Sequence, residues 1–287
     1  MNKTIILELP RWQGGNNIDY QLGSRILSCI IPINDTFEKV TIDVNTTNVN
    51  LCLVDGIKGG DELLRQSQNI DNILKRKKPD SIIVLGGDCS VSQVPFEYLK
   101  SVYKGKLGLI WLDAHPDVAN VSNSEHLHEM VLANLLGENK NSELTNVKSS
   151  FKPSEVLMVG LIEEELREKD KLCLDLKLKS ITTNTLLNNK EVVSDWIEKN
   201  GFEYMAIHLD LDVLDPRDFR SILPAKPHYN VEDFQAAVGT MTLETLSELF
   251  TEISKHSKVV GLSIAEHMPW DMLLLKRTLS KLSIFEE

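Results

Sequence analysis

Short runs of apolar, mostly β-branched residues alternate along this chain with longer stretches in which apolar residues recur at helical spacing. Such alternation predicts parallel β-strands that are joined by right-handed helical crossovers. Continuous apolar strands also fit a sheet that helices cover on both faces. The predicted strands are Thr4–Leu9, Ser81–Leu85, Leu107–Leu112, Glu155–Val159, Met205–Leu211 and Val259–Ile264.

The segments between these strands supply the helices. The predicted helices are Asp61–Lys75, Val91–Tyr103, His128–Leu136, Glu191–Lys199, Val231–Lys255 and Asp271–Leu282. Two segments are predicted to be irregular: Glu138–Pro153, a polar and exposed connection, and Pro216–Tyr229, a long loop with three prolines. We therefore predict an α/β fold, a three-layer α/β/α sandwich around a mostly parallel doubly wound sheet, formed as one domain over residues 1–287.

Composition and charge narrow the class of protein. With 42% hydrophobic and 25% charged residues, the chain is typical of a globular protein. Its net charge of -11 disfavours binding to nucleic acid or to an anionic membrane. Charged and polar residues interrupt the first apolar run, so no signal peptide is expected. Four scattered cysteines indicate free thiols in a reducing compartment, and we predict a cytoplasmic protein without membrane or nucleic-acid partners.

Candidate chemistry begins where the apolar run Leu109–Leu112 ends in Asp113-Ala114-His115-Pro116-Asp117. In an extended segment, alternate side chains point to the same side, so the two aspartates and the histidine would converge on one point. Such a group favours a metal or catalytic site, although a simple turn at the end of a strand is the alternative interpretation.

A second apolar strand carries His208, Asp210 and Asp212 on one face. Aspartate is disfavoured within strands and is almost never buried without a partner, so a bound cation would offset these charges. A solvated edge strand is the alternative. His208 either contacts a metal ligand or is a hydrogen-bonded histidine of the core.

Two further strands end in residues that could belong to a binding or catalytic site. The first runs into Gly86-Gly87-Asp88-Cys89-Ser90, and the second into Ala265-Glu266-His267-Met268-Pro269. Taken alone, Asp88 is expected to cap a helix, and Glu266 fits a surface turn. However, ligands of open α/β sheets bind at the carboxyl ends of the strands, which is where all these residues fall.

Together these elements resemble the arginase–agmatinase (ureohydrolase) superfamily, and the resemblance extends from about Ser81 to Pro269. Its pieces are Gly86-Gly87-Asp88-Cys89-Ser90, Asp113-Ala114-His115-Pro116-Asp117, Ser124 to His128, Asp210-Leu211-Asp212 with Leu214-Asp215-Pro216, and Glu266. The resemblance implies a three-layer fold with two divalent metal ions, expected to be manganese. It also implies a small guanidino or amidino substrate and a homo-oligomer, either a trimer or a hexamer.

The resemblance also implies roles for individual residues. The metal ligands would be Asp113 and Asp210 as bridges, Asp117 with Cys89 on one ion, and His115 with Asp212 on the other. Glu266 would hold the cationic substrate group, and His128 would shuttle protons. Ser124 and His126 are further substrate contacts, with His126 a lesser candidate for proton transfer. Glu163 or Glu165 falls where arginases contact the substrate's α-amino group, although a solvated acidic helix start explains both equally well.

This chain departs from the family's pattern at Cys89, where the family has histidine. Thiolate is a softer ligand that favours zinc, iron or cobalt over manganese. It also gives the ligand set one more negative charge than two dications neutralise, which would reduce their Lewis acidity. A substrate with a more electrophilic carbon or a better leaving group would tolerate this change, and superfamily members that act on N-hydroxyarginine resemble this chain in having cysteine here. The alternative is that Cys89 does not bind metal.

The predicted function is therefore hydrolysis of a C–N bond in an arginine-like or N-hydroxyarginine-like compound by metal-bridging hydroxide, which releases urea or hydroxyurea. Agmatinase, guanidinobutyrase or formimidoylglutamase activity is the alternative, as is a catalytically impaired metal-binding homologue. Two further departures leave the substrate open: Glu129 replaces a small residue after His128, and Arg217–His228 replaces a glycine-rich segment.

Overall fold

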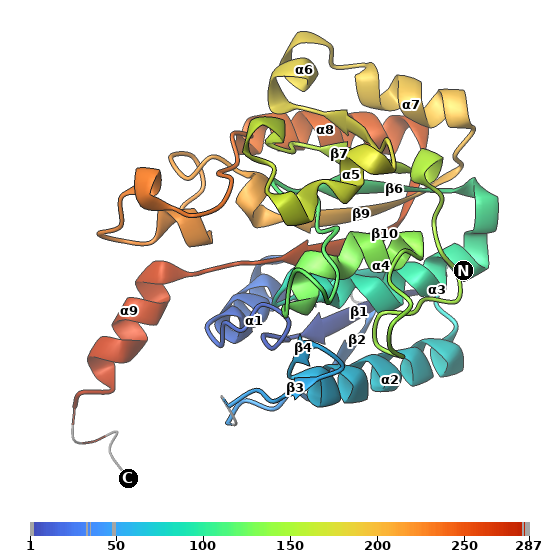
Figure 1. Ribbon diagram of the computed structural model, residues 1–287. Coiled ribbons are helices and arrows are strands. Elements are labelled where there is room, and N and C mark those ends of the chain that lie inside the picture. The colour runs from blue at the N-terminus through green and yellow to red at the C-terminus, as the bar shows by residue number, and fades with distance from the viewer. Residues whose placement is uncertain (1–2, 33, 35, 48–49, 283, 285–287) are drawn as a thin grey trace.

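Eight parallel strands form one central sheet in the order β2-β1-β5-β10-β9-β6-β7-β8 (Figure 1). A computed structural model gives this fold and describes residues 3–282 and 284, except 33, 35 and 48–49. The strands are β1 (Thr4–Leu9), β2 (Glu38–Thr41), β5 (Ser81–Gly86), β6 (Leu107–Leu112), β7 (Val156–Val159), β8 (Lys179–Ile181), β9 (Tyr204–Asp210) and β10 (Lys258–Ala265). A short antiparallel hairpin, β3 (Leu53–Val54) with β4 (Ile57–Lys58), lies outside this sheet.

Helices cover both faces of the sheet, which confirms the predicted α/β fold. The helices are α1 (Tyr20–Ile30), α2 (Gly60–Lys77), α3 (Gln93–Tyr103), α4 (Val131–Leu136), α5 (Leu172–Asp175), α6 (Thr183–Asn188), α7 (Val192–Asn200), α8 (Leu243–His256) and α9 (Trp270–Leu279). Leu74 of α2 and Phe96 of α3 pack with Val84 on one face of β5. On the opposite face of the sheet, α1 packs on β1 and β5, while α7 and α8 pack on β6 and β9.

The six predicted strands are all present, to within one residue at either end. Besides the hairpin strands β3 and β4, the strands missed were β2 and β8, which lie at the two edges of the sheet and are partly exposed. Without a continuous apolar run, neither gives a clear strand signal. Helix α1 was also missed, because the positions it buries include Gly23 and Ser24 rather than a full apolar stripe.

The predicted helix Val231–Lys255 was wrong over its first half. The α-helix begins only at Leu243, where the side chain of Thr242 accepts a hydrogen bond from the backbone of Thr245. Before it, Gly239 packs so closely on the backbone of Asp212 that a Cβ there would lie 2.2 Å from the Asp212 carbonyl oxygen. Tertiary packing therefore keeps this segment out of a helix.

The predicted connection Glu138–Pro153 is exposed only in part. It is irregular, but Thr145 and Phe151 are buried, and Asn139 donates a hydrogen bond to the carbonyl of Ala119. The loop Pro216–Tyr229 contains a single short 3-10 turn, Leu223–Ala225, as expected for a long connection. Among the described residues, no helix is long and apolar enough to cross a membrane, and a cytoplasmic location stays a prediction.

Candidate metal centre

Four neighbouring central strands bring the candidate residues together at the carboxyl ends of the strands. Strands β5, β10, β9 and β6 lie side by side, and their carboxyl ends lead into the predicted ligands. Cys89 opens a 3-10 turn after β5, Asp113 follows β6, Asp210 ends β9, and Glu266 follows β10. The order of strands in the sheet, rather than their order in the sequence, therefore assembles the site.

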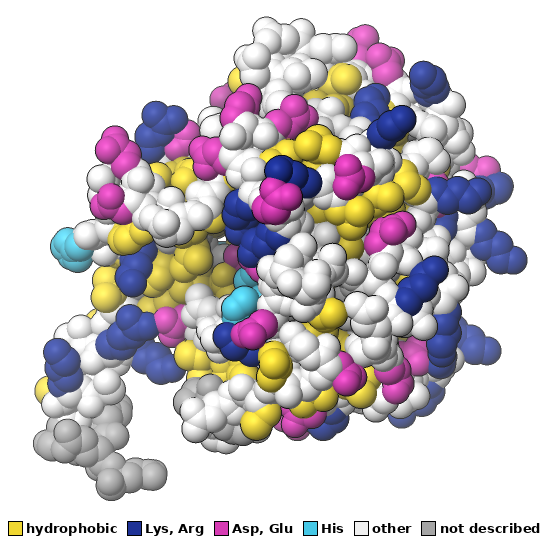
Figure 2. Space-filling model, in the orientation of Figure 1, with side chains coloured by type: hydrophobic (Ala, Val, Ile, Leu, Met, Phe, Trp, Pro, Cys, Tyr) yellow, Lys and Arg dark blue, Asp and Glu magenta, His cyan; other side chains and the backbone are white. Residues whose placement is uncertain are grey.

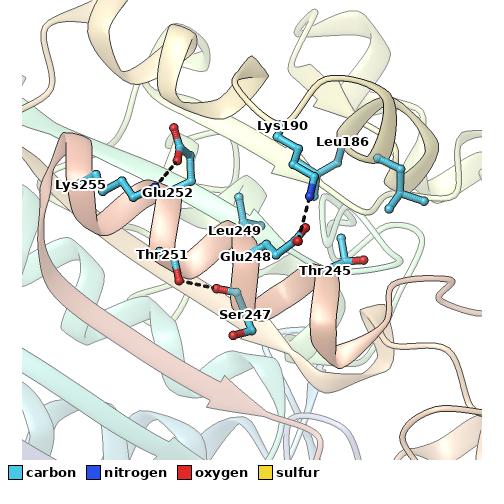
Figure 3. A pocket seen from close by; sticks show the side chains of 10 residues that line it. Leu186, Lys190, Thr245, Ser247, Glu248, Leu249, Thr251, Glu252 and Lys255 are labelled. Atoms are coloured by element: carbon cyan, nitrogen blue, oxygen red, sulfur yellow. Dashed lines mark hydrogen bonds and ion pairs between the residues drawn. The ribbon is translucent and has the colours of Figure 1, made fainter.

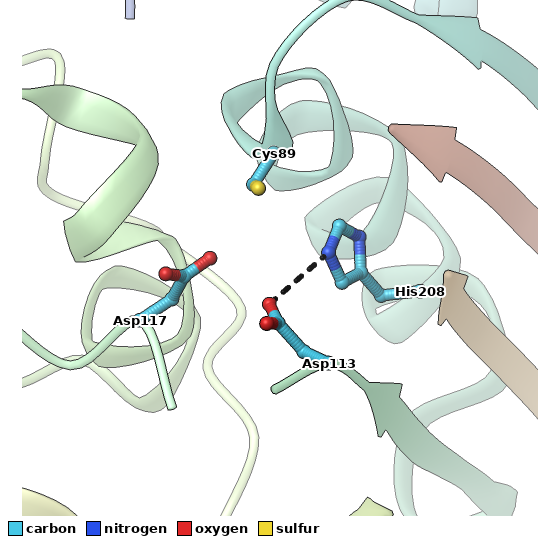
Figure 4. Close-up of side chains that lie close together, drawn as sticks. All are labelled: Cys89, Asp113, Asp117 and His208. Carbon is cyan, nitrogen blue, oxygen red and sulfur yellow. Dashed lines mark ion pairs between the residues drawn. The ribbon is translucent and has the colours of Figure 1, made fainter. Parts of the chain in front are cut away.

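The ligand atoms form three groups, within each of which they lie within 4.8 Å of one another. The groups are Cys89, Asp113, Asp117 and His208 (Figure 4); Asp113, His115 and Asp212; and Cys89, Asp210 and Glu266. Because Asp113 belongs to two groups and Cys89 to two, the groups are adjacent. Every predicted metal ligand lies in at least one of them.

The predicted geometry of the Asp-x-His-x-Asp segment was wrong, although its residues do converge. The chain bends after Leu112 instead of continuing as a strand. The backbone amide of His115 donates to Asp113 Oδ1 at 2.6 Å, and Asp117 has a left-handed φ of 49°. His115 Nδ1 then lies 3.1 Å from Asp212 Oδ2. A turn, rather than an extended strand, brings these side chains together.

His208 is a histidine of the core that also faces the candidate centre. Its ring stacks on Trp111 with centroids 3.7 Å apart, and its Nδ1 lies 2.8 Å from Ser92 Oγ. Burial lowers its pKa to about 3, so the ring is neutral. Nε2 lies 3.8 Å from Asp113 Oδ2, as the dashed line in Figure 4 marks. These contacts support the interpretation as a hydrogen-bonded histidine of the core, and its role beside a metal ligand stays a prediction.

The buried carboxylates of the site repel one another, which favours the binding of cations. Burial, followed by repulsion from Asp212, raises the pKa of Asp113 to about 7 and that of Glu266 to about 8. Burial and neighbouring carboxylates also raise the pKa of Asp117 and Asp210 well above the usual range. In the part of the chain that the structure describes, no lysine or arginine forms an ion pair with these four carboxylates. Buried acids without cationic partners are costly, and divalent ions would neutralise them.

Unpartnered polar atoms point to the same conclusion. Among the described side chains, His115 Nε2 and Asp117 Oδ2 are buried and have no hydrogen-bond partner. A buried acceptor left unpaired costs about 1–3 kcal/mol. Carboxylate and imidazole donors in this arrangement fit divalent metal ions.

Cys89 lies among the candidate ligands. Its Sγ is 2.8 Å from Asp210 Oδ2 and 3.5 Å from Glu266 Oε1. Burial, and then the charge of Asp210, raises the pKa of this thiol well above its usual value. The thiol donates to Asp210 in this state, whereas a metal would bind the thiolate and displace the proton.

Glu266 and His128 face each other beside this thiol. Glu266 has a left-handed φ of 61°, which costs a non-glycine residue about 1 kcal/mol. Its Oε1 lies 3.8 Å from His128 Nδ1, and burial lowers the pKa of His128. Its Oε2 accepts a hydrogen bond of 2.7 Å from the hydroxyl of Tyr20. Sequence reasoning missed Tyr20, because no motif distinguishes it in the first thirty residues.

The rim of the site carries mixed charge. Glu129 accepts hydrogen bonds from Ser124 Oγ and Lys169 Nζ, both at 2.5 Å. His126 stacks on His128 with ring centroids 5.9 Å apart. Figure 2 shows histidine and basic side chains together at a hollow in this face of the molecule. Glu163 and Glu165 are exposed, and their predicted contact with substrate stays a prediction.

A separate surface pocket of about 300 Å³ lies between α6 and α8 (Figure 3). Its side chains include the ion pair between Lys190 and Glu248, whose Nζ and Oε1 are 2.8 Å apart. None of the three ligand groups contributes to its lining. The candidate metal ligands therefore lie at the strand ends and not in this pocket.

Comparison with known proteins identifies the family. Residues 34–270 match the model of the arginase family. This chain belongs to the arginase family. An arginase of Staphylococcus aureus (strain COL) is 27% identical over 193 residues, which cover 63% of each chain. An arginase of Bacillus subtilis (strain 168) is 30% identical over 195 residues, which cover 66% of this chain and 62% of the relative. The match thus spans less than two thirds of the length of these arginases.

Solved arginases share the fold of this arginase-family chain over a greater length. The arginase of Entamoeba histolytica, in complex with L-ornithine, superposes with a TM-score of 0.77 at 17% identity, covering 94% of this chain and 92% of its own. The Bacillus caldovelox arginase gives the same TM-score and coverage at 19% identity. The N-terminal segment that contains Tyr20 precedes the residues matched by the family model.

Proposed function

We propose that this arginase-family protein is a dinuclear-metal hydrolase that cleaves a C–N bond of a guanidino or amidino compound. The observation that carries this proposal is the pair of ligand groups that share Asp113 and lie beside Glu266. In this proposal Asp117 and Cys89 would help to hold one divalent ion, and His115 and Asp212 would help to hold the other. Asp113 and Asp210 would be further ligands of the same centre.

Each remaining side chain has a task in this reaction. The bound cations would supply the Lewis acidity that makes hydroxide available from water near neutral pH. Glu266 would pair with the cationic group of the substrate and so orient its central carbon. His128, whose Nδ1 is 3.8 Å from Glu266 Oε1, would deliver a proton to the leaving nitrogen.

We propose an arginine-like or N-hydroxyarginine-like substrate. Support comes from Cys89, whose Sγ lies 2.8 Å from Asp210 Oδ2 and adds negative charge to the ligand set when it is ionised. A weaker Lewis acid favours a substrate whose central carbon is more electrophilic, as in an N-hydroxyguanidine, whose hydroxylamine-like nitrogen is less basic. Agmatine, guanidinobutyrate and formimidoylglutamate are the competing substrates, and a homo-oligomer is expected from the family.

Metal reconstitution followed by product analysis tests the proposal. The metal-free chain is loaded with Mn, Zn, Fe or Co, the bound metals are counted, and a guanidine panel is assayed for urea, hydroxyurea and ammonia. We expect two ions per chain and product from at least one compound. Two bound ions without product from any compound would point instead to a non-catalytic metal-binding protein. A chain that binds no metal would reject the proposed centre itself.

A further inference from the structure

A residue outside the matched family range reaches the centre of the candidate site. Tyr20, the first residue of α1, is only 2% exposed, and its hydroxyl donates to Glu266 Oε2 at 2.7 Å. We propose that Tyr20 is a positioning residue that fixes the carboxylate of Glu266 in the orientation that receives the substrate's cationic group. This inference rests on the proposed function, in which Glu266 binds that group.

Glu266 needs such a restraint. It follows the end of β10 in a left-handed conformation, and its amide donates to the carbonyl of Gly87 at 2.7 Å. That bond fixes the backbone but does not set the torsions of the side chain. The hydroxyl of Tyr20 occupies Oε2, which leaves Oε1 to face Cys89 and His128. The tyrosine thus orients the carboxylate and leaves one of its oxygens to meet the substrate.

Tyr20 is itself held rigidly by the segment that precedes it. The amide of Gly15 donates to Asp88 Oδ2 at 3.0 Å, which ties this segment to the turn that carries Cys89. Gly15 packs tightly against two of the residues that contact Glu266. A Cβ at this position would lie 3.0 Å from the ring of Tyr20 and 2.6 Å from His128 Nδ1. The segment therefore places Tyr20 and His128 on either side of one carboxylate.

Helix α1 is anchored as well, because Ser24 Oγ donates to the carbonyl of Leu85 at 2.7 Å. The anchored helix thus holds the phenol hydroxyl in place beside the Glu266 carboxylate. Preorganisation of this kind is what a substrate-orienting group requires.

Tyr20→Phe tests the inference, because it removes one oxygen and keeps the ring. Tyr103→Phe is the matched control, since the Tyr103 hydroxyl donates to the carbonyl of Asp80 at 2.7 Å, away from the site. In the metal-reconstituted full chain, we expect Y20F to lower kcat/KM at least tenfold with two ions still bound, and Y103F to change it less than twofold. A value of kcat/KM within twofold of wild type for Y20F would overturn the inference.

Two further measurements separate positioning from other causes. Crystal structures of Y20F and wild type should differ in the orientation of the Glu266 carboxylate. If that carboxylate does not move, the inference fails even if the wild type proves inactive, whereas inactivity alone rejects only the proposed function. In a Glu266→Asp background, whose shorter side chain withdraws from the phenol, Y20F should lower kcat/KM less than twofold further. A fully additive loss would show that Tyr20 does not act through Glu266.

Discussion

Cys89 is the single residue on which the type of reaction depends. Its Sγ lies within 3.5 Å of both Asp210 and Glu266, so it contacts a proposed metal ligand and the proposed substrate-binding carboxylate at once. A histidine at this position would bind metal without adding charge. The thiolate changes both the preferred metal and the charge that the substrate meets.

Cys89→His should therefore change the substrate preference. One unit charge about 4 Å away contributes several kcal/mol at the effective dielectric of a protein surface. We expect the ratio of arginine to N-hydroxyarginine hydrolysis to rise by about tenfold or more, with manganese favoured over zinc. Steady-state kinetics and metal analysis measure both effects. The control is Cys173→Ser, since Cys173 is buried in α5 and belongs to none of the ligand groups. A fall in the ratio would reject the charge explanation.

Some residues of the candidate site could be predicted from the sequence, and others could not. The proposed ligands were predictable, because aspartates directly after apolar strands are rare enough to stand out and matched a family's motifs. Tyr20 was not predictable, since its role depends on a contact between residues 246 positions apart. The turn at Asp113–Asp117 was missed for a similar reason: its shape depends on φ at Asp117, and aspartate tolerates either conformation.

At the scale of elements, the turn after β5 joins three segments. The amide of Asp88 donates to the carbonyl of Arg11, and the amide of Glu266 donates to the carbonyl of Gly87. The buried guanidinium of Arg11 donates from Nε to Gln66 and from Nη1 to the carbonyl of Ser90. Hydrogen bonds therefore join the connections after β1, β5 and β10 into one layer that includes the turn of Cys89.

Gly87→Ala should break this layer. A Cβ at Gly87 would lie 1.5 Å from the carbonyl oxygen of Arg11, and backbone atoms on both sides leave little room for adjustment. We expect a loss of about 3 kcal/mol or more in the free energy of unfolding, measured by urea denaturation. Gly105→Ala, with nothing within 4 Å of the added carbon, should stay within about 0.5 kcal/mol of wild type. Equal stability of the two variants would contradict the proposed close packing.

At the scale of the whole molecule, the sheet brings acidic side chains together at the carboxyl ends of its central strands. Parallel strands with right-handed crossovers were predictable from the alternation of apolar runs, and so was the location of the site at the carboxyl ends. The position of β9 and β10 between β5 and β6 was not, because local sequence does not encode strand order. That order places four buried carboxylates, from Asp113, Asp117, Asp210 and Asp212, in one cluster.

Metal removal should therefore destabilise the whole fold. At about 100 times its dissociation constant, each bound ion contributes about 2.7 kcal/mol. Since 1 kcal/mol corresponds to about 2–4 °C in a domain of this size, a chelator should lower the Tm at pH 8 by about 5 °C or more, as measured by calorimetry.

Asp117→Asn distinguishes charge repulsion from a general effect of the chelator. Asn tolerates the left-handed conformation at this position, and among the described residues Asp117 Oδ2 has no partner to lose. Removing this charge relieves repulsion in the metal-free cluster but weakens metal binding. The variant should therefore melt above metal-free wild type and respond less to the chelator. A metal-free variant that melts below metal-free wild type would show that repulsion among these carboxylates does not limit the stability of the fold.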